Sequence, residues 1–211
     1  MSKRILHLDD HGVVSKGLEK IVERAHRGAV VVGVKDAFTT LNFLRSERWD
    51  LVVLDIGLKG KSGLEVLKEI RQIASKLPVL IFSIHTSVEF VRRAINNGAS
   101  GYISKESSDE ELVEAINTIL AGAKYVSPKL KDELIFNPQT SSHSALSERE
   151  FEVLLMIGDG KTTREIATAL HISQSTVDTY RLRIKTKMGM KRDAELVRHC
   201  ILAGLVTANR P

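Results

Sequence analysis

Several short apolar runs in the first half of the chain are followed closely by polar side chains suited to phosphate or metal chemistry. These side chains are Asp9, Asp10, Asp55, Ser83 and Lys105. The carboxyl ends of parallel strands meet at one edge of a sheet, so we expect the five to lie together. Three carboxylates in one place repel one another unless a cation lies between them, and Mg²⁺ prefers oxygen ligands. The ammonium and the hydroxyl suit the oxygens of a phosphoryl group.

Each of these residues also has an ordinary structural interpretation. An aspartate after a strand commonly caps a helix or lies in a solvated loop, and a single serine commonly lies in a turn. A single lysine is usually a surface residue. The joint placement at the ends of successive strands is what favours a functional site.

The elements that would position these side chains alternate along residues 1–123. Apolar runs predict strands at 4–8, 30–34, 51–54, 79–83 and 101–103. Amphipathic segments predict helices near 12–25, 37–46, 63–75, 87–97 and 108–121. This pattern indicates the α/β class: a five-stranded parallel, doubly wound, flavodoxin-like sheet covered by helices on both faces.

The rest of the chain has a different pattern. Residues 124–145 lack a clean period, and the small polar residues at 137–144 predict an interdomain linker. Residues 146–211 show helical patterns only, so we predict a second, all-α domain there. Two capping boxes support its helices: Ser147 with Glu150, and Thr162 with Glu165.

A tight turn at 171–173 separates two predicted helices of this second domain, of which the second runs to about residue 188. One face of that second helix is apolar and must pack inward; it carries Val177, Tyr180, Ile184 and Met188. The opposite face presents Ser175, Asp178, Thr179, Leu182, Arg183 and Thr186. Closer to the flanks are Arg181, Lys185 and Lys187.

A helix of this kind fits the major groove of double-stranded DNA, with its outward face on base edges and its flanking cations on phosphates. Residues 181–192 hold six basic residues and no acidic one, and the chain as a whole has a net charge of +5. From the pattern alone, a small helical protein-interaction module with a solvated basic face is the alternative.

The first domain resembles the receiver domains of two-component response regulators over about residues 3–122. The segments that carry the resemblance are LHLDDHGVVSKGL, VVLDIGLKGKSGLEVLKEIR, VLIFSIHT and NGASGYISKE. The resemblance implies that a sensor histidine kinase phosphorylates Asp55. It also implies that Asp10, Asp55 and the backbone carbonyl of Gly57 bind Mg²⁺, and that Asp9 acts through water.

The resemblance assigns three further roles and leaves some departures. Ser83 and Lys105 would hold the phosphoryl group, and Tyr102 would be the aromatic residue that turns inward on activation. Gly12 stands where proline is frequent, and Leu58-Lys59 stands where Met-Pro is usual, which alters loop stiffness more than chemistry. His85 could modify the lifetime of the phosphoryl group or be an inert loop residue.

The second domain resembles the LuxR-type helix-turn-helix of the NarL/FixJ class over about residues 145–207. The base-contacting positions of that family fall on Asp178, Thr179 and Leu182. Lysine is frequent where Asp178 stands; an aspartate can accept from a cytosine amino group but repels phosphate. The family dimerises on DNA through its last helix, here 192–203. Core packing could equally explain its stripe of Ala194, Val197 and Ile201.

These observations predict a DNA-binding transcriptional regulator controlled by phosphorylation. The alternative is a receiver-type interaction module that never takes phosphate. An enzyme is not expected, because Gly57 stands where a phosphoaspartyl hydrolase would need a second carboxylate.

The single cysteine, Cys200, is expected to be a buried thiol in a reduced compartment. MSKRILHLDD does not read as a signal peptide, and no run approaches the ~20 apolar residues of a membrane span, so we expect a cytoplasmic protein.

Overall fold

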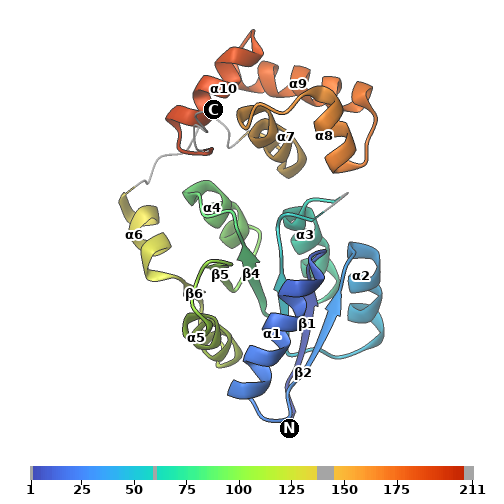
Figure 1. Cartoon of the computed structure of the whole chain (residues 1–211), viewed down its shortest axis with the longest axis vertical. Coiled ribbons are helices and arrows are strands. Elements are labelled where there is room, and N and C mark those ends of the chain that lie inside the picture. Colours follow the sequence, from blue (N-terminus) through green and yellow to red (C-terminus); the bar gives the residue numbers. More distant parts are fainter. Residues whose placement is uncertain (1, 59–60, 137–144, 207–211) are drawn as a thin grey trace. The chain divides into compact units, whose positions relative to one another are not determined.

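A computed structural model of the chain describes residues 2–58, 61–136 and 145–206 (Figure 1). The chain divides into two units, Met1–Asn137 and Pro138–Pro211. The expected linker stretch 137–144 lies outside the described residues, as does Lys59.

The N-terminal unit is built on one parallel sheet. Its strands are β1 (Arg4–Leu8), β2 (Val30–Val34), β3 (Leu51–Leu54), β4 (Val79–Ser83), β5 (Gly101–Ser104) and β6 (Tyr125–Val126). They lie in the order β2-β1-β3-β4-β5-β6, and every pair is parallel. The predicted doubly wound α/β fold is therefore confirmed. The sequence predicted five strands, and the sixth has only two residues, too few to show a periodicity.

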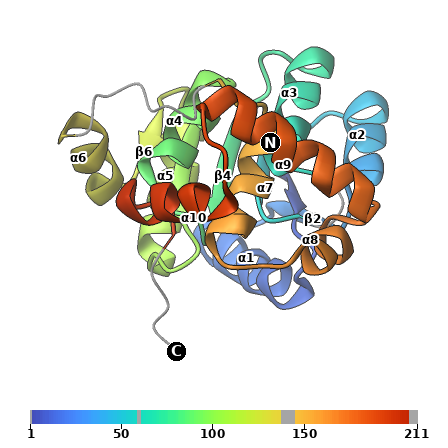
Figure 2. The same ribbon diagram turned by 90° about the horizontal axis from the view of Figure 1, so that it is seen from above.

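Helices cover both faces of this sheet. They are α1 (Gly12–Ala25), α2 (Ala37–Ser46), α3 (Gly63–Ile73), α4 (Val88–Asn96) and α5 (Asp109–Leu120). Figure 2 shows α1 and α5 on one side of the sheet and α2, α3 and α4 on the other. On the first side, Ile5 and Val53 pack with Leu18 of α1 and Ile116 of α5. Because both faces are buried, β3 is wholly apolar and β4 is apolar up to its last residue, rather than alternating.

Residues 124–136, the first part of the expected linker 124–145, form regular secondary structure instead. There β6 pairs with β5, and helix α6 (Pro128–Phe136) packs against α4. Pro128 stands at the first position of α6, where its missing N–H costs nothing. Residues 124–136 therefore belong to the N-terminal unit, and tertiary contacts rather than local pattern hold them there.

The C-terminal unit is helical, as predicted, with α7 (Glu148–Gly158), α8 (Thr163–Leu170), α9 (Gln174–Met188) and α10 (Asp193–Leu202). Both predicted capping boxes are present, at Ser147 and at Thr162. Between α8 and α9, His171 adopts a left-handed conformation with φ of 52°, and Ser173 then caps α9. Gly189, with φ of 67°, ends α9. The chain thus forms a helix-turn-helix from α8 and α9.

The last helix buries a different stripe from the one singled out in the sequence. Leu196 and Cys200 face the core, and Cys200 lies against Gly158 of α7. Ala194 is exposed, Val197 is half-buried and Ile201 is 42% exposed, so core packing does not account for their stripe. Burial, and to a smaller extent the charge of Asp159, raises the pKa of Cys200 to about 12. The thiol therefore stays protonated at neutral pH, which agrees with a packing role. None of the described helices combines the length and the apolarity that crossing a membrane requires.

Candidate functional site

The acidic residues lie where the strand order reverses. The chain moves outward from β1 to β2 on one side and to β3 on the other, so the carboxyl ends of β1 and β3 flank a crevice. Asp9 and Asp10 follow β1 there, and Asp55 follows β3. The backbone N–H of Asp55 donates to the carbonyl of Leu8 at 3.0 Å, which fixes the two loops side by side.

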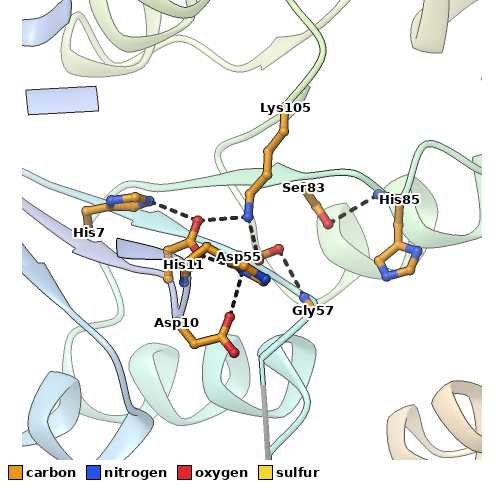
Figure 3. Close-up of polar contacts among 9 residues, drawn as sticks. His7, Asp10, His11, Asp55, Gly57, Ser83, His85 and Lys105 are labelled. Atoms are coloured by element: carbon orange, nitrogen blue, oxygen red, sulfur yellow. Dashed lines mark hydrogen bonds and ion pairs between the residues drawn. The ribbon is translucent and has the colours of Figure 1, made fainter. Parts of the chain in front are cut away.

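Lys105 joins two of these carboxylates (Figure 3). Its Nζ lies 2.6 Å from Oδ2 of Asp55 and 2.7 Å from Oδ2 of Asp9. Both carboxylates are buried. Burial by itself lowers the pKa of Lys105, but its hydrogen bonds to Asp55 and Asp9, together with their charges, outweigh this effect and raise the pKa. The lysine is therefore a stable cation that offsets part of the charge of the pocket.

The pocket also has the ligand chemistry of a divalent cation site. One carboxylate oxygen each from Asp9, Asp10 and Asp55, together with a ring nitrogen of His11, lie within 4.8 Å of one another. Carboxylate oxygens are the ligands that Mg²⁺ prefers. The set fits Mg²⁺, with Asp10 and Asp55 as candidate ligands. Gly57, the third expected ligand, donates its N–H to Oδ1 of Asp55 at 3.0 Å and is exposed to solvent.

Ser83, Tyr102 and His85 form a connected group beside the acidic pocket. The Ser83 hydroxyl is buried and accepts a hydrogen bond from the N–H of His85 at 3.3 Å. The Tyr102 ring is also buried, and its hydroxyl donates to the backbone carbonyl of His85. Burial and the nearby charge of Asp55 raise the pKa of Tyr102. The His85 ring stacks on Phe90 of α4 with 4.6 Å between ring centroids, which ties this group to α4.

In the C-terminal unit, α9 presents the two faces expected from its sequence. Val177 and Ile184 are fully buried. Tyr180 and Met188 are half-buried at the edges of the same face. The residues of the opposite face are all exposed: Ser175, Asp178, Thr179, Leu182, Arg183 and Thr186. Leu182 is 65% exposed, so its apolar side chain is open to solvent on this face.

The flanking cations of α9 are held by carboxylates of the same unit. Arg181 forms an ion pair with Asp193, and Lys185 Nζ lies 3.1 Å from the other oxygen of Asp193. Lys187 Nζ lies 2.6 Å from Oε2 of Glu150. The three predicted cations thus lie on α9, but the carboxylates of Asp193 and Glu150 partly offset their positive charge.

The two units match two families. The response regulator receiver domain family matches residues 5–117, and the family of bacterial regulatory proteins, luxR family, matches residues 144–200. The first match alone spans more than half of the chain.

The chain belongs to the two-component response regulators with a LuxR-type DNA-binding domain.

Known response regulators are similar over nearly their whole length. The transcriptional activator protein ExaE of Pseudomonas putida is 36% identical over 208 residues, covering 96% of this chain and 97% of that protein. The response regulator GacA of Pseudomonas aeruginosa is 32% identical over 211 residues, covering 97% and 98%. A LuxR-family response regulator structure from Aurantimonas sp. SI85-9A1 is 37% identical, with a TM-score of 0.62, and covers 65% of this chain and 99% of that one.

A second solved structure is similar in fold alone. RcsB of Salmonella enterica serovar Typhimurium, bound to the promoter rprA, has a TM-score of 0.67 at 20% identity and covers 94% of this chain and 98% of that one.

Two histidines of this response regulator were not singled out from the sequence as site residues. His7, inside β1, is fully buried, and its Nε2 lies 3.7 Å from Oδ2 of Asp9. Burial is the largest effect on the pKa of His7 and lowers it to about 4, so the ring is neutral at pH 7. A polar residue in the middle of the apolar run RILHL was the available signal. His11 directly follows the aspartate pair, and its ring reaches both carboxylates.

Proposed function

We propose that Asp55 accepts a phosphoryl group from a sensor histidine kinase. The observation that carries this proposal is the setting of its carboxylate, with Oδ1 bonded to the N–H of Gly57 and Oδ2 bonded to Lys105. In the transfer, a carboxylate oxygen attacks the phosphorus of the phosphohistidine of the kinase. The new P–O bond forms as the P–N bond breaks, and the electron pair stays on the imidazole of the kinase. The role is regulatory, since Gly57 offers no second carboxylate for hydrolysing an external substrate.

Neighbouring groups would stabilise the charge of the transferred group. Lys105 and the Ser83 hydroxyl would hold phosphoryl oxygens, and the nearness of Lys105 Nζ to Oδ2 of Asp55, at 2.6 Å, supports this role for the lysine. Asp10, Asp55 and the carbonyl of Gly57 would bind Mg²⁺, and Asp9 would act through water. When bound, Mg²⁺ supplies positive charge that offsets the repulsion between the carboxylates and the incoming phosphoryl group.

Gly57 keeps the approach to Asp55 open. A Cβ atom at this position would lie 3.7 Å from both carboxylate oxygens of Asp55, so a larger side chain would cover them. The Nε2 atom of His85 would lie 3.8 Å from the same Cβ, close enough for this ring to affect how long the phosphoryl group persists. The hydroxyl of Ser83 would turn toward the phosphoryl group and release the N–H of His85, and Tyr102 and α4 would follow.

The output is double-stranded DNA binding by α9. Ser175, Asp178, Thr179, Leu182 and Arg183 would face the major groove, because these side chains are exposed on one face. Arg181, Lys185 and Lys187 would contact phosphates at the flanks. The exposed stripe of α10 would join two copies into a homodimer on DNA, with half-sites about one helical turn apart. Since it acts on the bacterial chromosome, the protein would work in the cytoplasm.

The first prediction tests the phosphoryl site. We expect incubation with acetyl phosphate and Mg²⁺ to add one phosphoryl group to the wild type and none to Asp55→Asn, because an amide is not nucleophilic. Intact-protein mass spectrometry measures this directly. Asp36→Asn is the matched control: Asp36 caps α2, and asparagine caps equally well. Equal labelling of Asp55→Asn and the wild type would move the site elsewhere, and an unlabelled wild type would favour the interaction module that never takes phosphate.

A further inference from the structure

We infer that His11 adds an imidazole ligand to the acidic pocket and makes it a site for transition-metal ions such as Mn²⁺ and Zn²⁺ as well as for Mg²⁺. This inference deepens the proposed function and rests on it, because it concerns the same pocket. Asp10 and Asp55 supply carboxylate ligands of the site, and the carboxylate of Asp9 lies beside them. His11 decides which ions bind it most tightly.

The His11 ring is aimed at the carboxylates. Its Nδ1 lies 2.9 Å from Oδ1 of Asp10 and 3.2 Å from Oδ1 of Asp9. A ring nitrogen of His11 and one oxygen from each of the three aspartates all lie within 4.8 Å of one another, so together they could hold a metal ion. The backbone N–H of His11 also donates to Oδ1 of Asp9 at 2.8 Å, which holds the residue against the pocket. The ring itself is 62% exposed, so an ion from solvent can reach it.

A second imidazole lines the inner side of the same pocket (Figure 3). His7 is 0% exposed and directs its Nε2 toward Oδ2 of Asp9, 3.7 Å away. Neither of its ring nitrogens has a hydrogen-bond partner among the described residues. His7 and Lys105 both approach Oδ2 of Asp9, while Oδ1 faces His11. Oδ1 of Asp9 therefore lies on the same side of the pocket as Nδ1 of His11.

The mixed ligand set favours particular ions. Mg²⁺ prefers oxygen ligands throughout and gives up its waters reluctantly. Imidazole binds Mn²⁺ and, more strongly, Zn²⁺ in the usual order of divalent first-row metals. With an added imidazole, the site should therefore bind Mg²⁺ much as the carboxylates alone would, but it gains affinity for the transition metals from the nitrogen. The single cysteine, Cys200, is buried in the core of the C-terminal unit and adds no thiolate ligand to this set.

The test compares metal affinities of the full chain by titration calorimetry at pH 8, where an imidazole is ordinarily neutral and able to bind a metal. We expect His11→Gln to weaken Mn²⁺ and Zn²⁺ binding about tenfold or more, and Mg²⁺ binding less than threefold. The His11 side chain makes no cap bond to α1, so this substitution leaves the helix start intact. His171→Asn, which changes an exposed histidine in the left-handed turn of the other unit, is the control and should change neither affinity.

A spectroscopic readout shows the ligand itself. Electron spin echo spectra of the Mn²⁺-loaded wild type should contain modulation from a directly bound imidazole nitrogen, and His11→Gln should lack it. Equal losses of Mn²⁺ and Mg²⁺ affinity in His11→Gln, or a nitrogen signal that persists, would overturn the inference.

Phosphoryl labelling distinguishes failure of the inference about His11 from failure of the proposed function. If the wild type is labelled but His11→Gln binds Mn²⁺ as tightly as the wild type does, only the role of His11 fails. If the wild type is not labelled at all, the phosphorylation proposal fails, whatever the metal affinities show.

Discussion

At the scale of single residues, the pocket is governed by how each charge is compensated. Asp9 and Asp55 share the ammonium of Lys105, which replaces part of the hydration they lose on burial. His7 lies next to Asp9 yet stays neutral, because burial disfavours its charged form more than the carboxylate favours it. The pocket therefore holds one cation of its own and leaves net negative charge for a metal.

His7 gives a pH-dependent prediction. Its pKa is about 4 in the folded chain and ordinarily 6.5, so between these values the unfolded chain binds the proton more readily. The contribution of His7 to stability is therefore complete above pH 6.5 and is lost as the pH falls toward 4. From pH 7.5 to 5, the wild type should lose about 2 kcal/mol more unfolding free energy than His7→Leu.

Urea titrations followed by Trp49 fluorescence measure this difference, because the only tryptophan lies buried in the N-terminal unit. His171→Asn changes the other unit, so the unfolding free energy reported by Trp49 should depend on pH as it does in the wild type. The same pH dependence in His7→Leu and the wild type would contradict the assignment.

At the scale of elements, the start of α3 is packed directly against the phosphoacceptor loop. A Cβ on Gly63, the first residue of α3, would lie 2.2 Å from the carbonyl oxygen of Asp55 and 2.6 Å from Cα of Ile56. Both are backbone atoms, so no side-chain rotation can relieve the contact. The N–H of Gly63 donates to the carbonyl of Ile56 at 3.1 Å and holds this approach.

Gly63→Ala should therefore destabilise the N-terminal unit by roughly 1–3 kcal/mol and reduce phosphoryl labelling, because the loop must move. Urea unfolding and mass spectrometry measure the two effects. Gly17→Ala is the matched control, since a Cβ there meets nothing within 4 Å and alanine favours the helix interior. A Gly63→Ala protein as stable and as readily labelled as the wild type would contradict this account.

Helix α9 combines an exposed face, which we propose meets the bases of DNA, with cations held by its own unit. Arg183 is exposed, and the described residues offer it no ion pair, whereas Arg181 and Lys185 are bound to Asp193. Part of the charge of the helix is thus used to hold α10 in place before DNA arrives.

Two substitutions on α9 should have different effects on DNA binding. Lys185→Ala should weaken binding to all sequences alike and lower the slope of log affinity against log salt by about one, while Asp193 keeps its ion pair with Arg181. Thr179→Ala should cost roughly 1–3 kcal/mol on the preferred site and little on random DNA. Fluorescence anisotropy at several salt concentrations distinguishes them, with Arg24→Ala in the other unit as control. If Thr179→Ala acts equally on all sequences, it does not read bases.

At the scale of the whole molecule, the proposed function needs both units and a second copy of the chain. The stripe of Ala194, Val197 and Ile201 on α10 stays outside the core, where Leu196 and Cys200 lie instead. A partly exposed apolar stripe on the last helix is suited to a symmetric contact with its own counterpart.

Ile201→Asp should therefore abolish cooperative binding to a DNA site with two half-sites and leave the affinity for an isolated half-site unchanged. Gel shifts on the two fragments measure this, with Arg198→Ser, another exposed position of α10, as control. Unchanged cooperativity in Ile201→Asp would place the dimer contact elsewhere.

Much of this protein was determined by its sequence alone. The apolar runs and their spacing predicted the first five strands, four of them with the observed bounds, because strand and helix periods are local properties. The positions of Asp10, Asp55 and Lys105 after successive strands predicted that they would meet. The capping boxes and Gly189 predicted where helices of the second unit begin and end, since a cap depends on residues only a few positions apart.

The tertiary structure decided the rest, because it depends on partners that are distant in the sequence. Only the fold shows that Lys105 joins Asp9 to Asp55, and that Asp193 binds the cations of α9. It likewise places residues 124–136 in the sheet and against α4, which no local period indicates. Helix α10 carries two apolar stripes, and the one that contains Cys200 is buried because it packs against α7.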